Sequence, residues 1–197
     1  MILHKILYPL AWLAMHLYHP FSRVIGRENI PEEGCMICAN HSALSDPVWL
    51  CLGLGIRSRK QLHIMAKKEA MEWPVLGKLF HALGAYGIDR GNADLAAIKN
   101  TLTYLKDGDS VVIFPEGTRM KPGKVVEPKT GAVMLASRSG VPILPVYITH
   151  NKRPFRPVQV IFGQPISMEG RKRLSAGELE EQTHQMMDGI YALGAAK

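Results

Sequence analysis

Apolar residues follow two different spacings along this chain. Between residues 35 and 162 there are six short apolar runs, CMICA, LHIMA, AYGI, SVVIF, ILPVYIT and VQVIF. Runs of this length that are bounded by turn residues are typical of buried strands. Between them lie longer segments in which apolar residues recur every three or four positions, the spacing of one helix face. The alternation predicts an α/β fold, with a mostly buried mixed sheet flanked by helices.

Residues that favour helix ends indicate where the predicted helices start and stop. Asp46 is a good N-cap and precedes a proline, which suits a first helical turn, so a helix is expected over 46–54. Asn92 is expected to cap a second helix, and Gly140 to end a third. Ser175 and Glu178 have the spacing of a capping box, which opens the last helix. Residues 73–83 are a further helical stretch.

The first twenty residues are the most apolar part of the chain, and we expect them to form an amphipathic membrane-associated helix. One helix face carries Leu3, Ile6, Leu10, Leu13 and Leu17, and another carries Lys5, Tyr8, Trp12, His16 and His19. The second set combines cations with amphipathic aromatic rings, so we expect it to face lipid headgroups. The alternatives are an ordinary core-packing helix and a signal peptide, for which the segment offers no convincing cleavage site. Residues 1–20 are predicted to anchor the chain at the cytoplasmic face of the cell membrane, either lying on the bilayer or spanning it.

The charge of the chain narrows the choice of partners. Lys and Arg number 24 against 17 Asp and Glu, a net charge of +7, which favours nucleic acid, acidic membranes or phosphorylated molecules. The cations occur in short separate groups, at 57–60, 67–68, 152–153 and 171–173. Scattered groups suit a phosphate pocket and a membrane-facing rim better than a nucleic-acid stripe. A membrane surface is therefore an expected partner, and nucleic acid is not.

Several common catalytic motifs are absent from the sequence. It holds no G-x-x-x-x-G-K-[ST] phosphate loop, no G-x-S-x-G nucleophile elbow and no H-E-x-x-H metal motif. Cys35 and Cys38 form a C-x-x-C without a second pair, inside an expected strand. We interpret them as core residues rather than as a zinc or redox site. No metal and no cofactor are expected.

A histidine and an aspartate lie at the turn after the first expected strand. His41 precedes the predicted helix start at Asp46, so the loop can bring the imidazole back over the carboxylate. A carboxylate bonded to one ring nitrogen fixes the tautomer and makes the other nitrogen a better base. The alternative is that Asp46 only caps the helix and that His41 is a solvated loop residue.

Two further turns carry polar residues that a core would not need. In VVIFPEGTR, a strand ends at Phe114, Gly117 lets backbone approach a ligand, and Thr118 and Arg119 have the chemistry to bind a phosphate. In GIDRG, Arg90 follows another short strand. A surface ion pair between Asp89 and Arg90 is the alternative there.

Together these residues resemble the glycerolipid acyltransferase family, whose members acylate lysophosphatidic acid. The first family motif, N-H-x4-D, is met by Asn40, His41 and Asp46, and the third, F-P-E-G-T-R, is complete over 114–119. The second and fourth motifs are met by GAYGIDR, 84–90, and by the strand at 141–146. The resemblance runs in order from about residue 25 to residue 162, and 21–197 is expected to be the acyltransferase domain.

Two positions depart from the family pattern. Gly87 stands where a bulky aromatic residue is usual, and Met120 stands where serine is common after the arginine. The first departure is expected to alter the acyl or acceptor pocket.

The resemblance implies a mechanism and a set of site residues. His41, oriented by Asp46, would deprotonate the free hydroxyl of 1-acylglycerol 3-phosphate, and the oxygen would attack a thioester carbonyl without an acyl-enzyme. Backbone N–H groups near the start of the helix at residue 46 would stabilise the oxyanion. The lysophospholipid is one substrate, and acyl-CoA or acyl-carrier protein is the donor. The implied substrate-binding residues are Asn40, Lys67, Arg90, Glu116, Gly117, Thr118 and Arg119.

Two other functions stay open from the sequence. The same chemistry could act on another lysolipid or on glycerol 3-phosphate. A non-catalytic lipid-binding membrane protein is a different class, and the His41 and Asp46 pair disfavours it because binding alone needs no base.

Overall fold

The computed structural model describes residues 2–55, 61–74, 76–82, 84–89, 94–121, 123, 126–171 and 173–195. Over these residues the strands form one sheet in the order β1-β7-β6-β2-β5-β3-β4. All neighbouring strands are parallel except β6 and β7, which are antiparallel, so the sheet is mixed, as predicted. The strands are β1 Arg23–Ile25, β2 Met36–Ala39, β3 Leu62–Lys67, β4 Ala85–Ile88, β5 Ser110–Ile113, β6 Ile143–Ile148 and β7 Gln159–Phe162.

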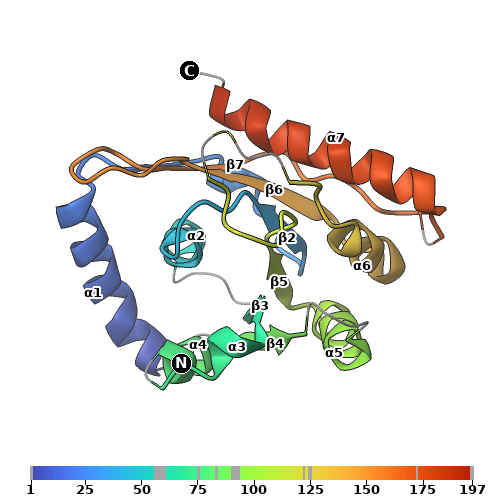
Figure 1. Ribbon diagram of the computed structural model, residues 1–197, viewed down its shortest axis with the longest axis horizontal. Helices are drawn as coiled ribbons and strands as arrows, with labels where there is room; N and C mark the ends of the chain where they lie inside the picture. Colours follow the sequence, from blue (N-terminus) through green and yellow to red (C-terminus); the bar gives the residue numbers. More distant parts are fainter. Residues whose placement is uncertain are drawn as a thin grey trace.

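Helices cover both faces of the sheet (Figure 1). One layer holds α1 to α4 and the other holds α5 to α7. The described helices are α1 Ile2–Tyr18, the short 3-10 helix η1 Arg27–Asn29, α2 Asp46–Leu54, α3 Lys68–Met71, α4 Leu76–Ala82, α5 Leu95–Lys106, α6 Gly131–Ser139 and α7 Ala176–Ala195.

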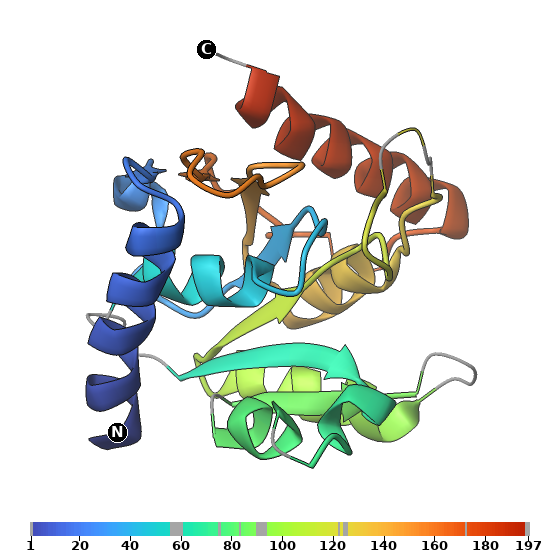
Figure 2. The ribbon, with the colours of Figure 1, turned by 60° about the vertical axis from the view of Figure 1, so that its left-hand side comes forward.

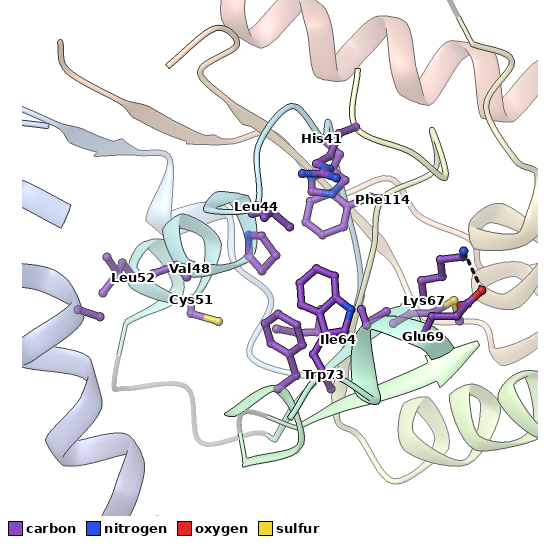
Figure 3. A pocket seen from close by; sticks show the side chains of 18 of the residues that line it. His41, Leu44, Val48, Cys51, Leu52, Ile64, Lys67, Glu69, Trp73 and Phe114 are labelled. Atoms are coloured by element: carbon purple, nitrogen blue, oxygen red, sulfur yellow. Dashed lines mark ion pairs between the residues drawn. The ribbon is translucent and has the colours of Figure 1, made fainter. Parts of the chain in front are cut away.

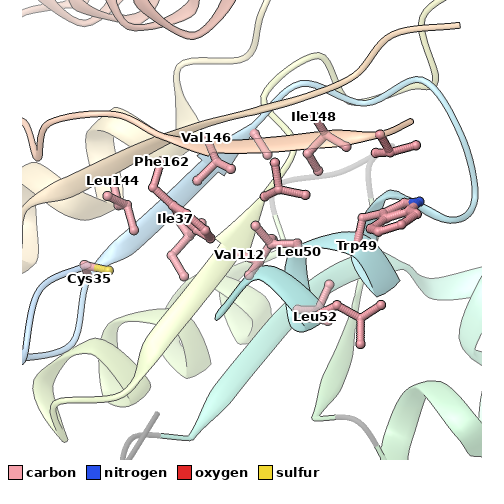
Figure 4. Close-up of a cluster of buried hydrophobic side chains, with 14 of the residues drawn as sticks. Cys35, Ile37, Trp49, Leu50, Leu52, Val112, Leu144, Val146, Ile148 and Phe162 are labelled. Carbon is pink, nitrogen blue, oxygen red and sulfur yellow. The ribbon is translucent and has the colours of Figure 1, made fainter. Parts of the chain in front are cut away.

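The central strands are buried on both sides, because successive side chains point to opposite faces of a sheet. In β2, Ile37 and Ala39 join the core under α2, whereas Met36 and Cys38 join the core under α6 and α7. Figure 4 shows the first core, where Trp49 and Leu50 of α2 pack over the sheet. Burial of both Cys35 and Cys38 confirms that this run is a core strand, and burial raises the pKa of the Cys35 thiol to about 11.

The ends of α6 and α7 follow the predicted caps, whereas the caps of α2 and α5 differ. Ser45, and not Asp46, is the N-cap of α2. Gly140 ends α6 at φ 75°, and Ser175 and Glu178 form the capping box before α7. The cap of α5 is Asp94, whose carboxylate accepts the N–H of Ala97 at 2.9 Å; the expected cap, Asn92, lies outside the described residues. Asp94 is a good N-cap because its carboxylate accepts a backbone N–H and also complements the positive end of the helix dipole.

The α1 helix lies along the α2 side of the molecule, away from α7 (Figure 2). Of the side chains predicted to point outward, Trp12 is exposed, whereas Tyr8 and His19 lie inward. Tyr8 donates to the carbonyl of Leu52 at 3.1 Å, and the buried His19 bonds the carbonyl of Arg156 at 2.9 Å. These rings face inward because the protein offers acceptors for their polar ends. The exposed face carries Leu10, Leu13 and Leu17 together with Trp12.

The fold leaves the mode of membrane contact as a prediction. No helix in the described part of the chain has both the length and the apolar character needed to cross a bilayer. Tyr8, Ala11 and Met15 pack against the sheet core, so α1 is attached to the rest of the molecule.

Candidate active site

Polar side chains from three turns gather at one edge of the sheet. His41 follows β2, Glu116 follows β5 and Lys152 follows β6, and these three strands are neighbours and parallel. The carboxyl ends of parallel strands meet at the same edge, where ligands of α/β proteins are usually bound. The topology therefore brings together three turns that are far apart in the sequence.

Asn40 holds the end of β2 against the end of β6. Its Nδ2 donates to the carbonyl of Ile148 at 2.8 Å, and its Oδ1 accepts the N–H of Ile148 at 2.7 Å. The side chain is fully buried, and both ends of its amide are used by the backbone. Asn40 thus fixes where the next residue, His41, leaves the sheet, and its contact with substrate stays a prediction.

His41 and Asp46 form the expected pair. Nδ1 of His41 lies 2.9 Å from Oδ2 of Asp46, which makes Nδ1 the protonated nitrogen and leaves Nε2 with the lone pair of a base. The ring also stacks on Phe114, with 4.3 Å between centroids and 26° between planes. The pair is therefore oriented from two sides, and the alternative of a freely solvated histidine is wrong.

Asp46 is fully buried but is surrounded by hydrogen-bond donors. Its Oδ2 also accepts the backbone N–H groups of Ser42 and Ala43 at 2.6 and 2.7 Å, and its Oδ1 accepts a short bond from Nζ of Lys152. Burial raises the pKa of this carboxyl group, but the hydrogen bond from His41 and the charge of Lys152 outweigh burial and hold the pKa below its ordinary value. Asp46 is therefore a carboxylate at neutral pH.

These bonds narrow the choice of oxyanion donors. The N–H groups of Ser42 and Ala43 lie just before α2, where oxyanion donors were predicted, but both point at the Asp46 carboxylate. These two N–H groups stabilise the Asp46 carboxylate that orients His41, and they do not point at a reacting oxygen. Asp46 is the first residue of α2, with Ser45 at the N-cap, so its side chain is free to bond back into the loop.

Glu116 supports the backbone of His41. Its Oε2 accepts the His41 N–H at 2.6 Å, and its Oε1 accepts a short bond from the Tyr191 hydroxyl of α7. Burial raises the pKa of Glu116 above its ordinary value, against the hydrogen bonds from Tyr191 and His41, which lower it. Both carboxylate oxygens are thus engaged inside the protein.

A largely apolar cavity of about 570 Å³ opens beside His41 (Figure 3). Val48 and Cys51 of α2 line one side, Ile64 of β3 and Trp73 line another, and Leu10 of α1 completes the wall. Burial raises the pKa of the Cys51 thiol to about 12, which agrees with an apolar lining. Cavities of this size and character suit a ligand with a long apolar part.

Three of the predicted substrate-binding residues line the same cavity. Thr118 and Arg119 line it beside His41, and Lys67 lines it from the end of β3, paired with Glu69 at 2.7 Å. Gly117 makes the turn that leads to them, with φ 67° and its N–H bonded to the Phe114 carbonyl at 3.0 Å. Arg90 lies outside the described residues.

Two supporting residues were not predicted. Lys152 was noted only as part of a basic pair, although its position in the turn after the predicted strand at 143–149 was a usable signal. Tyr191 gave no signal, because it lies within a helix 75 residues from Glu116. In the described part of the chain, no cluster of three or more His, Cys, Asp or Glu side chains is arranged to hold a metal ion.

Comparison with known proteins gives the family. A family model described as acyltransferase matches residues 22–149. The chain belongs to the acyltransferase family. The 1-acyl-sn-glycerol-3-phosphate acyltransferase of Bacillus subtilis is 33% identical to this acyltransferase over 150 residues, which cover 73% of each chain. The enzyme of the same name from Pseudomonas aeruginosa is 31% identical over 182 residues, 86% of this chain and 68% of that one.

A solved structure supports the same assignment. The 1-acyl-sn-glycerophosphate (LPA) acyltransferase PlsC from Thermotoga maritima aligns with a TM-score of 0.70 and 28% identity, over 98% of this acyltransferase and 80% of that chain. The family predicted from the motifs is confirmed.

Proposed function

We propose that this acyltransferase moves a fatty acyl group from a thioester donor to the free hydroxyl of 1-acylglycerol 3-phosphate, which makes phosphatidic acid for phospholipid synthesis. One observation carries the proposal. The Nδ1 of His41 lies 2.9 Å from Asp46 on the wall of an apolar cavity that also carries Lys67 and Arg119. The relatives named above have names that state the same reaction.

The chemistry follows from the free nitrogen of His41. Nε2 takes the proton of the acceptor hydroxyl as its oxygen attacks the carbonyl carbon of the thioester. The new C–O ester bond forms, the C–S bond breaks, and the imidazolium returns its proton to the leaving thiolate. Asp46 stays ionised throughout and stabilises the imidazolium. General-base help of this kind contributes roughly 10²–10⁴ in rate.

The cavity supports a division of the substrates. Its apolar walls from α1, α2 and β3 suit a fatty acyl chain, and Lys67, Thr118 and Arg119 suit the phosphate of the acceptor. Arg90 joins them in this proposal through the family motif alone. The donor is acyl-CoA or acyl-carrier protein, and the reaction uses no cofactor.

The exposed surface supports work at a membrane. Leu13 and Leu17 of α1 are about half exposed or more, and they continue into Phe21 and Phe155, which are 84% and 72% exposed. The N–H of Phe155 donates to the Tyr18 carbonyl at 2.9 Å, so the two segments are joined. Arg153 and Arg156 are exposed in the same loop as Phe155 and suit anionic headgroups. We propose that this surface lies on the cytoplasmic face of the cell membrane.

A donor-by-acceptor activity matrix in detergent tests the reaction. Purified protein is given acyl-CoA or acyl-carrier protein together with 1-acylglycerol 3-phosphate, glycerol 3-phosphate or lysolipids without a terminal phosphate. The expected result is highest kcat/KM with 1-acylglycerol 3-phosphate, and loss of turnover with unchanged folding in His41→Ala. Preference for another acceptor would replace the proposed substrate, and product formation by His41→Ala at the wild-type rate would reject the mechanism. A protein that binds lipid without turnover would be the non-catalytic alternative.

A flotation assay tests the membrane surface separately. Phe155→Ser should weaken binding to vesicles that contain phosphatidylglycerol. Leu95→Ser is the matched control, because Leu95 is 74% exposed but lies on α5 in the opposite helical layer. Equal binding by both variants would remove the loop from the proposed surface.

A further inference from the structure

A lysine with almost no solvent contact lies behind the catalytic pair. The Lys152 side chain is 5% exposed, and its Nζ bonds Oδ1 of Asp46 and the Ser42 hydroxyl, the latter at 3.1 Å. It follows β6, whereas Asp46 begins α2, 106 residues earlier. Lysine is seldom buried without a specific partner, because removing its charge from water is unfavourable.

The two oxygens of Asp46 have separate tasks. Oδ2 accepts Nδ1 of His41, and Oδ1 accepts Lys152, so the ammonium lies on the far side of the carboxylate from the imidazole. Rotation of the carboxylate would break both bonds together. The Lys152 ammonium group therefore fixes the plane of the Asp46 carboxylate, and the carboxylate in turn fixes the His41 ring.

We propose that Lys152 is a positioning residue for acyl transfer, which holds the buried Asp46 carboxylate ionised and aligned and limits how strongly that carboxylate stabilises protonated His41. The inference rests on the proposed acyltransferase activity. Lys152 does not line the cavity and acts only through Asp46.

The charge arrangement gives a pH signature. The charged or titratable groups that act on Asp46 are His41, Lys152, and, from the turns after β5 and β6, Glu116 and His150. Without the ammonium, an uncompensated carboxylate would favour the imidazolium, which is inactive as a base. The buried carboxylate would itself take up a proton more readily. Both changes act in the same direction and move the acid limb of the pH–rate profile to higher pH.

The experiment measures kcat and KM against pH for wild type, Lys152→Met and Lys106→Met. Lys106 is exposed in the last turn of α5 and provides a control with the same change of net charge. Lys152→Met should lower kcat at neutral pH about 10-fold and raise the acid-limb midpoint by about one pH unit, with little change in the acceptor KM. Lys152→Arg, which keeps the charge, should restore part of the shift.

A double variant covers the case in which Lys152→Met does not fold. Asp46→Asn/Lys152→Met removes both buried charges, so it avoids an unpaired ion. It should have the activity of Asp46→Asn alone, since Lys152 then has no carboxylate to act on. A folded Lys152→Met with the acid limb of Lys106→Met would overturn the proposal, as would a double variant well below Asp46→Asn. Absence of acyl transfer in the wild type would instead refute the proposed function.

Discussion

Asn40 pairs with Ile148 through both ends of its side-chain amide, at 2.8 and 2.7 Å, and so continues the ladder between β2 and β6 beyond the last strand residue. The next residue is His41, whose N–H is accepted by Glu116 after β5. The backbone of His41 is thus held in place by contacts at the ends of three parallel strands, β2, β5 and β6. The first position of the N-H-x4-D motif suits asparagine, because only an amide both donates to the Ile148 carbonyl and accepts the Ile148 N–H.

Asn40→Asp should destabilise the protein, because aspartate has no N–H for the carbonyl of Ile148. Leaving a buried acceptor without its donor costs about 1–3 kcal/mol. The free energy of unfolding in urea measures the loss. Asn100→Asp, an exposed change on α5, should alter it by less than about 0.5 kcal/mol. Equal stability of the two variants would mean that the Ile148 pairing contributes nothing.

Arg119→Met and Lys67→Met should each raise KM for 1-acylglycerol 3-phosphate, because both side chains line the cavity beside His41. A charged hydrogen bond of about 1.5–3 kcal/mol corresponds to roughly 10- to 100-fold in kcat/KM. The loss should be small with an acceptor that lacks the phosphate. Equal losses with both acceptors would assign these cations another role.

Gly87→Phe should disturb the cavity through α3. A Cβ at Gly87 would already lie 3.3 Å from Cα of Lys68, so an aromatic ring must push α3 away from β4. Glu69 and Ala70 of α3 line the cavity, and acyl-chain preference should change with them. The unfolding free energy should fall by about 1–3 kcal/mol. Gly189→Phe on α7, where nothing lies within 4 Å of the added Cβ, is the control, and an unchanged chain-length profile in Gly87→Phe would contradict the argument.

Stability should depend on pH through Asp46. Its folded-state pKa lies below the ordinary value of 3.8, so the unfolded chain takes up a proton first as the pH falls. The contribution of Asp46 is complete above that value and is lost as the pH falls through the lowered pKa. Urea unfolding of wild type against Asp46→Asn at a series of pH values measures it. Wild type should lose stability more steeply below about pH 4, and parallel curves would show that Asp46 is not the cause.

Much of the fold was determined by local pattern. Six of the seven strands and the ends of α2, α6 and α7 follow from apolar runs and from residues that favour helix ends. Each of these signals lies within a few neighbouring positions of the sequence. The strand β1 was missed because its three residues alternate between exposed and partly buried without an apolar run. The His41 and Asp46 pair is local too, since Pro47 favours a helix start beside Asp46 and the two residues lie five positions apart.

Tertiary structure alone decided what surrounds that pair. Glu116 reaches His41 across 75 residues, Lys152 reaches Asp46 across 106, and Ile148 pairs with Asn40 across 108. These contacts depend on the order β6-β2-β5, which no short-range pattern encodes. Periodicity likewise did not show which face of α1 points inward, because one face carries leucines and the other carries aromatic rings that can also be buried. Tyr8 and His19 lie inward because the carbonyl groups of Leu52 and Arg156, in distant segments, are their hydrogen-bond partners. Leu10, Leu13 and Leu17 of α1 remain on the exposed side.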